Sequence, residues 1–134
     1  MDAIRLSVDS GLFILVWLVQ VIIYPSFDQI AREKLTCWHR LYTQKILYFV
    51  GPMMFVQTGL IAWQILLDPL VFMADGLLLA GIWINTFFIA IPIHESIDRE
   101  ESLKGYLHKL LRVNLWRSWM WTALFLISLV RVLA

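Results

Sequence analysis

Cysteine is almost absent from this chain: Cys37 is the only one among 134 residues. A single thiol excludes an intramolecular disulfide and offers no thiolate cluster for a metal, so we interpret Cys37 as a small interfacial hydrophobic residue. Net charge is nearly absent as well, with a formal value of +1. Because nucleic-acid-binding proteins need a basic face, we expect no nucleic acid among the partners.

Charged residues are scarce, at 16% of the chain, whereas hydrophobic residues make up 60%. Soluble domains are roughly 45–50% apolar, and a small one buries only about two thirds of the surface that its unfolded chain exposes. A soluble domain of this length could not hide so much apolar surface. We therefore expect the excess to face a lipid bilayer.

Four apolar runs follow one another along the chain, at about 11–27, 46–67, 70–93 and 113–133. Each is near the ~20 residues that cross ~30 Å of hydrocarbon, and none alternates as a membrane strand would. Asp2 and Asp9 interrupt the basic region that a signal peptide needs, and no small-residue cleavage site follows the first run. The sequence predicts an all-α integral membrane four-helix bundle, with residues 1–134 as a single domain.

The basic residues predict the orientation, since nine of the eleven arginines and lysines lie beside the two longer links. These nine are Arg32, Lys34, Arg40, Lys45, Arg99, Lys104, Lys109, Arg112 and Arg117. The short link around residues 67–70 has none. The positive-inside rule then places both basic links in the cytoplasm and both termini on the other side, which we interpret as the periplasmic side of a bacterial inner membrane.

Asp68 and Pro69 are suited to cap and begin the third span, which makes the second and third spans antiparallel neighbours. Residues 98–111 are typical of a surface helix or a helical extension of the last span. A weak internal similarity aligns the stretch from Pro25 to Leu41 with the stretch from Pro92 to Leu110. It predicts a parallel two-plus-two repeat about an axis along the membrane normal.

Several polar side chains from all four spans are expected at one depth, near the cytoplasmic boundary. Pro25, Pro52 and Pro92 each free a backbone carbonyl toward the same pole. Together these groups predict a polar pocket that opens to the cytoplasm, because ionisable groups at membrane depth tend to mark function. The candidate catalytic residues are His94, His39, Arg117 and Asn114, and the candidate substrate-binding residues are Tyr24, Trp121, Phe87 and Tyr42.

Each candidate also has a simpler interpretation. Arg117 could extend to the lipid headgroups, the histidines could bond interfacial carbonyls, and the aromatic residues could form an interfacial belt. Gln20, Gln57 and Asn85 lie deeper and fit interhelical hydrogen bonds.

A set of short motifs covers nearly the whole chain: Tyr24-Pro25-x-Phe27, His39, Gly51-Pro52-Met53-Met54 with Gln57, Thr86-Phe87-Phe88, Pro92-x-His94 and Asn114-x-x-Arg117-x-x-x-Trp121. The series resembles an uncharacterised family of small four-span bacterial inner-membrane proteins. In size and span count the chain is similar, more loosely, to anthrone-oxygenase-like membrane proteins and to small haem-pathway oxidases of the membrane. The resemblance implies a four-span membrane fold and no particular reaction.

His39 and His94 are the minimum for haem ligation or for part of a transition-metal site, although no pair at ligand spacing accompanies them. Alternatively, either histidine could move protons to or from a lipophilic molecule that Arg117 binds and that Trp121 and Phe87 stack against. Three functions stay open: a membrane oxidoreductase or other enzyme of a lipophilic small molecule, a transporter or channel-like oligomer, and a non-catalytic accessory subunit of a membrane complex. Because four short spans make a thin bundle, we expect a homo-oligomer in preference to a monomer.

Overall fold

The computed structural model describes residues 1–99 and 103–134, and these residues are almost entirely helical. The first helical stretch runs from Asp2 to Gln29 and comprises α1 (Asp2–Leu18), η1 (Val19–Ile23), α2 (Tyr24–Ser26) and η2 (Phe27–Gln29). The second is α3 (Arg32–Leu67). The third comprises α4 (Pro69–Asn85), η3 (Thr86–Ala90) and α5 (Ile91–Asp98), and the fourth is α6 (Leu103–Leu133).

Each apolar run expected from the sequence lies inside one of these four stretches, and all four are long and apolar enough to cross a membrane. The helices extend beyond the runs, so the first begins at Asp2 and not near residue 11. The all-helical class is confirmed for the described residues. The stretch 98–111 is partly a helical extension, because α6 already begins at Leu103, while residues 100–102 lie outside the described part of the chain.

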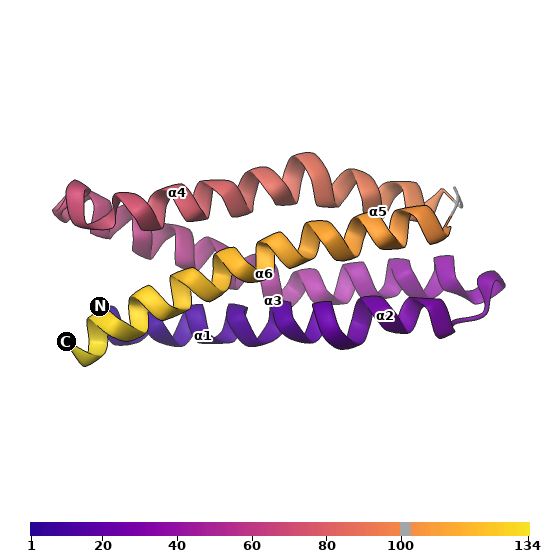
Figure 1. The fold of residues 1–134 in the computed structure, drawn as a ribbon, viewed down its shortest axis with the longest axis horizontal. Coiled ribbons are helices and arrows are strands. Elements are labelled where there is room, and N and C mark those ends of the chain that lie inside the picture. Colours follow the sequence, from indigo (N-terminus) through magenta and orange to yellow (C-terminus); the bar gives the residue numbers. More distant parts are fainter. Residues whose placement is uncertain (100–102) are drawn as a thin grey trace.

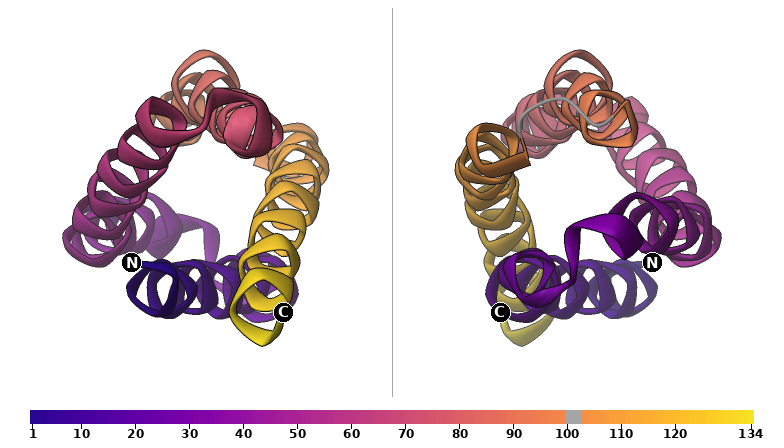
Figure 2. Two further views of the ribbon diagram at one scale, coloured as in Figure 1. Left: turned by 90° about the vertical axis from the view of Figure 1, so that its left-hand side faces the viewer. Right: turned by 90° about the vertical axis from the view of Figure 1, so that its right-hand side faces the viewer.

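The four stretches form a bundle in which α1 packs against α3 and α6, and α4 also packs against α3 and α6 (Figures 1 and 2). Both chain ends and the α3–α4 turn lie at one end of the bundle, which we call the terminal end. The link near residue 30 and the link after Asp98 lie at the other end, which we call the basic end. The arrangement brings side chains from all four stretches together at each end.

The turn at the terminal end has the predicted chemistry. The Asp68 carboxylate accepts a hydrogen bond from the backbone N–H of Val71 at 3.2 Å, and Pro69 occupies the first turn of α4. Proline is favoured there because its missing N–H would have no helical partner. A tight antiparallel pair of α3 and α4 results.

Two π-helical segments occur at matching places, η1 just before Tyr24-Pro25 and η3 just before Ile91-Pro92. In each, the residue before the proline donates its N–H to a carbonyl five residues back, Val19 in one case and Thr86 in the other. A π segment adds a residue to the turn and re-aims the side chains that follow, and such bulges are frequent at functional sites. Tyr24 follows η1 directly, and His94 lies about one turn after η3.

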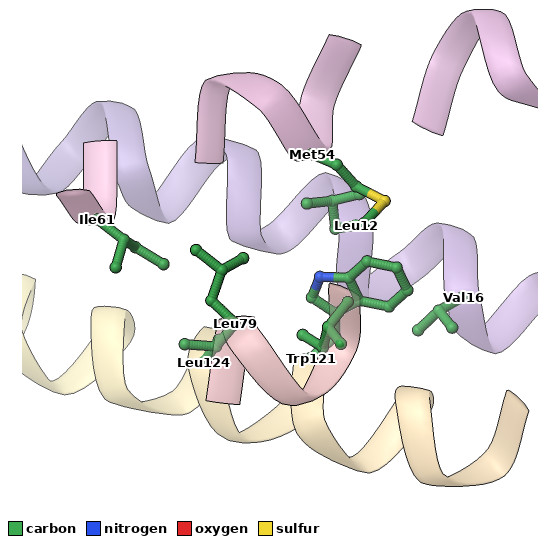
Figure 3. Packing of buried hydrophobic residues seen from close by; sticks show 8 residues of the cluster. Leu12, Val16, Met54, Ile61, Leu79, Trp121 and Leu124 are labelled. Atoms are coloured by element: carbon green, nitrogen blue, oxygen red, sulfur yellow. The ribbon is translucent and has the colours of Figure 1, made fainter. Parts of the chain in front are cut away.

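Apolar packing in the middle of the bundle draws on all four stretches (Figure 3). Figure 3 shows the side chains of Leu12, Val16, Met54, Ile61, Leu79, Trp121 and Leu124 converging between the helices. A second cluster at the basic end surrounds Tyr24 and Phe27 with leucine and isoleucine side chains from α3, α5 and α6. Several residues of these two clusters also line the cavity of the candidate site.

Candidate functional site

A cavity of about 380 Å³ lies between the helices in the half of the bundle nearer the basic end. Its volume falls in the range of small-molecule sites, roughly 300–1,000 Å³. Seven of the eight residues proposed from the sequence line it: Tyr24, Tyr42, Phe87, His94, Asn114, Arg117 and Trp121. His39 is the exception, since it is buried behind His94. The rest of the wall is mainly aliphatic and aromatic.

The cavity opens sideways, between α3 and the η3–α5 part of the third stretch. The lining residues with the largest exposure come from these two elements: Leu47 and Phe55 of α3 are 64% and 69% exposed, and Phe87 of η3 is 53% exposed. Ile91 of α5 continues this exposed margin. The opening is therefore bounded mainly by apolar side chains on the outer surface of the bundle, with the exposed carboxylate of Glu95 on α5 at its margin.

A chain of hydrogen bonds runs along one wall of the cavity. The Tyr24 hydroxyl lies 3.1 Å from Nε2 of His94, and Nδ1 of His94 lies 2.8 Å from Nε2 of His39. Nδ1 of His39 lies 2.7 Å from the Asp98 carboxylate. Tyr24 and His39 are buried, whereas Asp98 is 28% exposed and beside Arg40. The chain thus connects the cavity to the surface at the basic end.

The direction of donation follows from the carboxylate at its end. An ionised Asp98 can only accept, so His39 donates through Nδ1. With both rings neutral, Nε2 of His39 must then accept from Nδ1 of His94, and Nε2 of His94 must accept from the Tyr24 hydroxyl. Every donor points from Tyr24 toward Asp98, which lies both at the cavity margin and at the surface, and this is the arrangement that carries a proton from Tyr24 to Asp98.

Arg117 contributes a positive charge to the lining of the cavity, which it shares with Tyr24 and Tyr42. Its guanidinium carbon lies 5.2 Å from the centroid of the Trp121 ring. Its Nε is a buried donor without an acceptor, and among the described residues no carboxylate pairs with it.

Asn114 is held by α1. Its side-chain nitrogen donates to the side-chain oxygen of Gln20 at 2.9 Å and approaches the backbone carbonyl of Val16 at 3.5 Å. Gln57 bonds Asp9 and Trp121 on other helices, and Asn85 donates to the backbone carbonyl of Val113. Neither of these two amides lines the cavity. In the described structure Gln57 and Asn85 thus join helices, whereas Asn114 both joins α6 to α1 and lines the cavity.

The two histidines do not offer free nitrogens to a metal or to haem iron. All four ring nitrogens of His39 and His94 take part in the hydrogen-bond chain, so ligation would require breaking at least one of its links. Among the described residues, no group of three or more histidine, cysteine, aspartate or glutamate side chains could hold a metal ion. The described geometry therefore does not fit the haem or transition-metal hypothesis, and we derive no step through such a group.

A second polar cluster, at the terminal end, was not anticipated from the sequence. Arg5 contacts Asp9 at 3.3 Å, Gln64 at 2.7 Å and Asp75. Arg131 pairs with Asp75 through two nitrogens, each at 2.8 Å. Arg5, Asp9 and Asp75 are almost completely buried, and two cations meet two carboxylates. The cluster joins α1, α3, α4 and α6 and closes this end of the bundle.

Sequence reasoning also missed Asp98 and Gln20 as parts of the site. Asp98 lies four residues after His94 on one helix, so the shared face was a legible signal. Arg5 and Asp9 have the same four-residue spacing, and Asp75 interrupts an apolar run.

Comparisons with models of protein families, with curated proteins and with solved structures find nothing that matches this chain.

Proposed function

We propose that the chain is an integral membrane protein whose basic end faces the cytoplasm. Support comes from the four apolar helices and from the nine basic residues on the sequence segments of one end. Both termini then lie on the opposite, periplasmic side of a bacterial inner membrane. The matching π-helical segments before Pro25 and Pro92 favour the parallel two-plus-two repeat.

We further propose that the protein is an enzyme that removes a proton from a lipophilic small molecule. The observation that carries this proposal is the hydrogen-bond chain Tyr24–His94–His39–Asp98, which begins at the cavity and ends at a partly exposed carboxylate. Positioned proton acceptors of this kind contribute typically 10²–10⁴-fold to a reaction. The lateral apolar opening suits a ligand that arrives through the bilayer.

The steps balance as a proton relay. The acidic group of the ligand gives its proton to the Tyr24 oxygen, and the Tyr24 hydroxyl proton passes to Nε2 of His94. The Nδ1 proton of His94 passes to Nε2 of His39, and the Nδ1 proton of His39 passes to Asp98, which releases it to water. The ligand is left as an anion beside Arg117. We assign no electron transfer, since that would need an oxidant beyond these residues.

The test is to incubate the purified protein with a lipid extract of its host membranes and to analyse it by mass spectrometry in ²H₂O. We expect at least one lipophilic compound to be retained, and to be converted or to exchange hydrogen bound to carbon, because hydrogen bound to oxygen exchanges with ²H₂O without a catalyst. His94→Gln should abolish the conversion and keep the retention. His108→Gln, which changes an exposed histidine outside the relay, should change neither.

Cavity binding has its own matched pair of variants on α3. A Cβ at Gly51, which lines the cavity, would meet only the Leu47 side chain at 3.5 Å, while a Cβ at exposed Gly59 would meet nothing within 4 Å. Gly51→Leu should therefore exclude the retained compound and Gly59→Leu should not. Equal retention by both variants would overturn binding in the cavity, and conversion that survives His94→Gln would overturn the relay.

A second function is favoured by the asymmetry of the two ends. The cavity lies toward the basic end, while buried ion pairs close the terminal end, and such an asymmetry is expected of one state of a transporter. A transporter predicts flux of the retained compound into liposomes, with no chemical change in it. Conversion without flux would reject this alternative.

A further inference from the structure

We propose that Arg117 is an anion-binding residue and that the ligand is a monoanionic oxygen acid with a small apolar body, a carboxylate being the simplest case. This inference rests on the proposed function, because the anion beside Arg117 is what remains once the relay has taken the proton. It goes further by naming the chemical class of the ligand.

The first argument is the missing partner. The other two arginines in the interior or at its edge are both paired, Arg5 with Asp9 and Asp75, and Arg131 with Asp75. Arg117 has no hydrogen bond or ion pair among the described residues, and its Nε is buried without an acceptor. Arg117 as a whole is only partly buried, but burying a donor of a cation is costly unless it is paired, so an anion from outside the chain would complete this site.

The second argument is the orientation that the neighbours allow. The Trp121 ring lies 5.2 Å from the guanidinium carbon, an arrangement that stabilises the cation without using its N–H donors. Those donors lie in the guanidinium plane and match the two oxygens of a carboxylate. Tyr24, where the relay begins, lines the same cavity as Arg117.

The third argument is charge and size. Arg117 is the cation among the described lining residues, and the other charged ones, Glu95 and Asp98, are acidic. One cation suits a single negative charge and not a dianionic phosphate. The volume of about 380 Å³ lies near the lower limit for ligand sites, which excludes a whole two-chain phospholipid and admits a short single-chain or single-ring body.

The test measures equilibrium binding of ¹⁴C-labelled decanoate, decanol and decylammonium to the protein in nanodiscs of zwitterionic lipid, with empty nanodiscs as background. Wild-type protein should bind decanoate in preference to the other two. Arg117→Gln should weaken decanoate binding by about tenfold or more, as expected when a hydrogen bond to a charged group is lost, and should leave decanol binding unchanged. Arg117→Lys keeps the positive charge but loses the planar guanidinium, so its decanoate affinity should lie between those of wild type and Arg117→Gln.

Arg112→Gln, at an exposed position on the same helix, is the matched control and should bind like wild type. If Arg117→Gln does not fold, the three probes on wild-type protein still decide: equal binding of decanoate and decanol would overturn the acid proposal. That result would leave the proposed function standing if Gly51→Leu excluded both probes. If Gly51→Leu excluded neither, cavity binding itself would fail.

Discussion

Nε2 of His39 lies 2.8 Å from Nδ1 of His94, so the two histidines are hydrogen-bonded to each other. The partners are 55 residues apart in the chain and come from α3 and α5. The pair joins a buried tyrosine at the cavity to a carboxylate at the surface. The chain of hydrogen bonds has one direction of donation, because the Asp98 carboxylate at its end fixes which nitrogen of each ring carries the proton.

His39 and His94 are predicted to share one tautomer, with the proton on Nδ1 in both neutral rings. Long-range ¹H–¹⁵N correlation spectra of the protein in detergent measure this directly. Tyr24→Phe removes the donor to Nε2 of His94 and should shift that nitrogen resonance without moving either proton. Exposed His108 is the internal reference. A proton found on Nε2 of neutral His39 or His94 would contradict the relay as drawn.

The orientation in the membrane can be tested with the natural cysteine, which is exposed on α3 near the basic end. In intact cells, a membrane-impermeant maleimide should leave Cys37 unlabelled and should label it once the cells are opened. Asp68→Cys, made together with Cys37→Ser, should be labelled in intact cells because it lies in the turn at the terminal end. Labelling with the opposite pattern would reverse the proposed topology.

The sequence predicted the fold class because span length and hydrophobicity depend on local composition. It also predicted which residues gather at the basic end, since depth along a helix follows from residue number. Seven of the eight proposed site residues line one cavity for this reason. The depth of a residue in the membrane does not predict its hydrogen-bond partner. No feature of the neighbouring sequence indicates that His39 bonds His94 and not a metal, or that Asn114 bonds Gln20.

The terminal-end cluster could not be predicted from the sequence, because its residues come from distant parts of the chain. Arg5 and Asp9 precede the apolar run that the sequence predicts as the first span, and α1 includes both. Their partners on α3 and α4 are 48 to 70 residues away. Only the folded bundle shows that the arginines and aspartates of this cluster neutralise one another, which makes the burial of these charges energetically tolerable.

Breaking that cluster should cost a large part of the stability. Asp75→Asn keeps the volume of the side chain but leaves Arg5 and Arg131 without their shared carboxylate. Loss of one partner of a buried ion pair typically destabilises by about 3–5 kcal/mol, and we expect that loss in reversible unfolding from mixed detergent micelles. Arg99→Gln is the control, because its contact with Glu95 is 3.9 Å long and exposed, and such pairs contribute about 0–1 kcal/mol. Similar losses for the two variants would contradict the role given to Asp75.

Gln57 links the terminal-end cluster to the cavity, and its replacement should disturb both. Its side chain donates to Asp9 at 2.7 Å and accepts from the Trp121 indole nitrogen at 3.2 Å. Gln57→Leu leaves two buried polar groups without partners, at about 1–3 kcal/mol each, so the unfolding free energy should fall well below that of Gln44→Leu, an exposed position on the same helix. Because Trp121 lines the cavity, decanoate affinity should also fall in Gln57→Leu and not in Gln44→Leu. A loss of stability with unchanged binding would show that Gln57 supports the bundle without positioning Trp121, whereas loss of both places the two polar clusters in one connected structure.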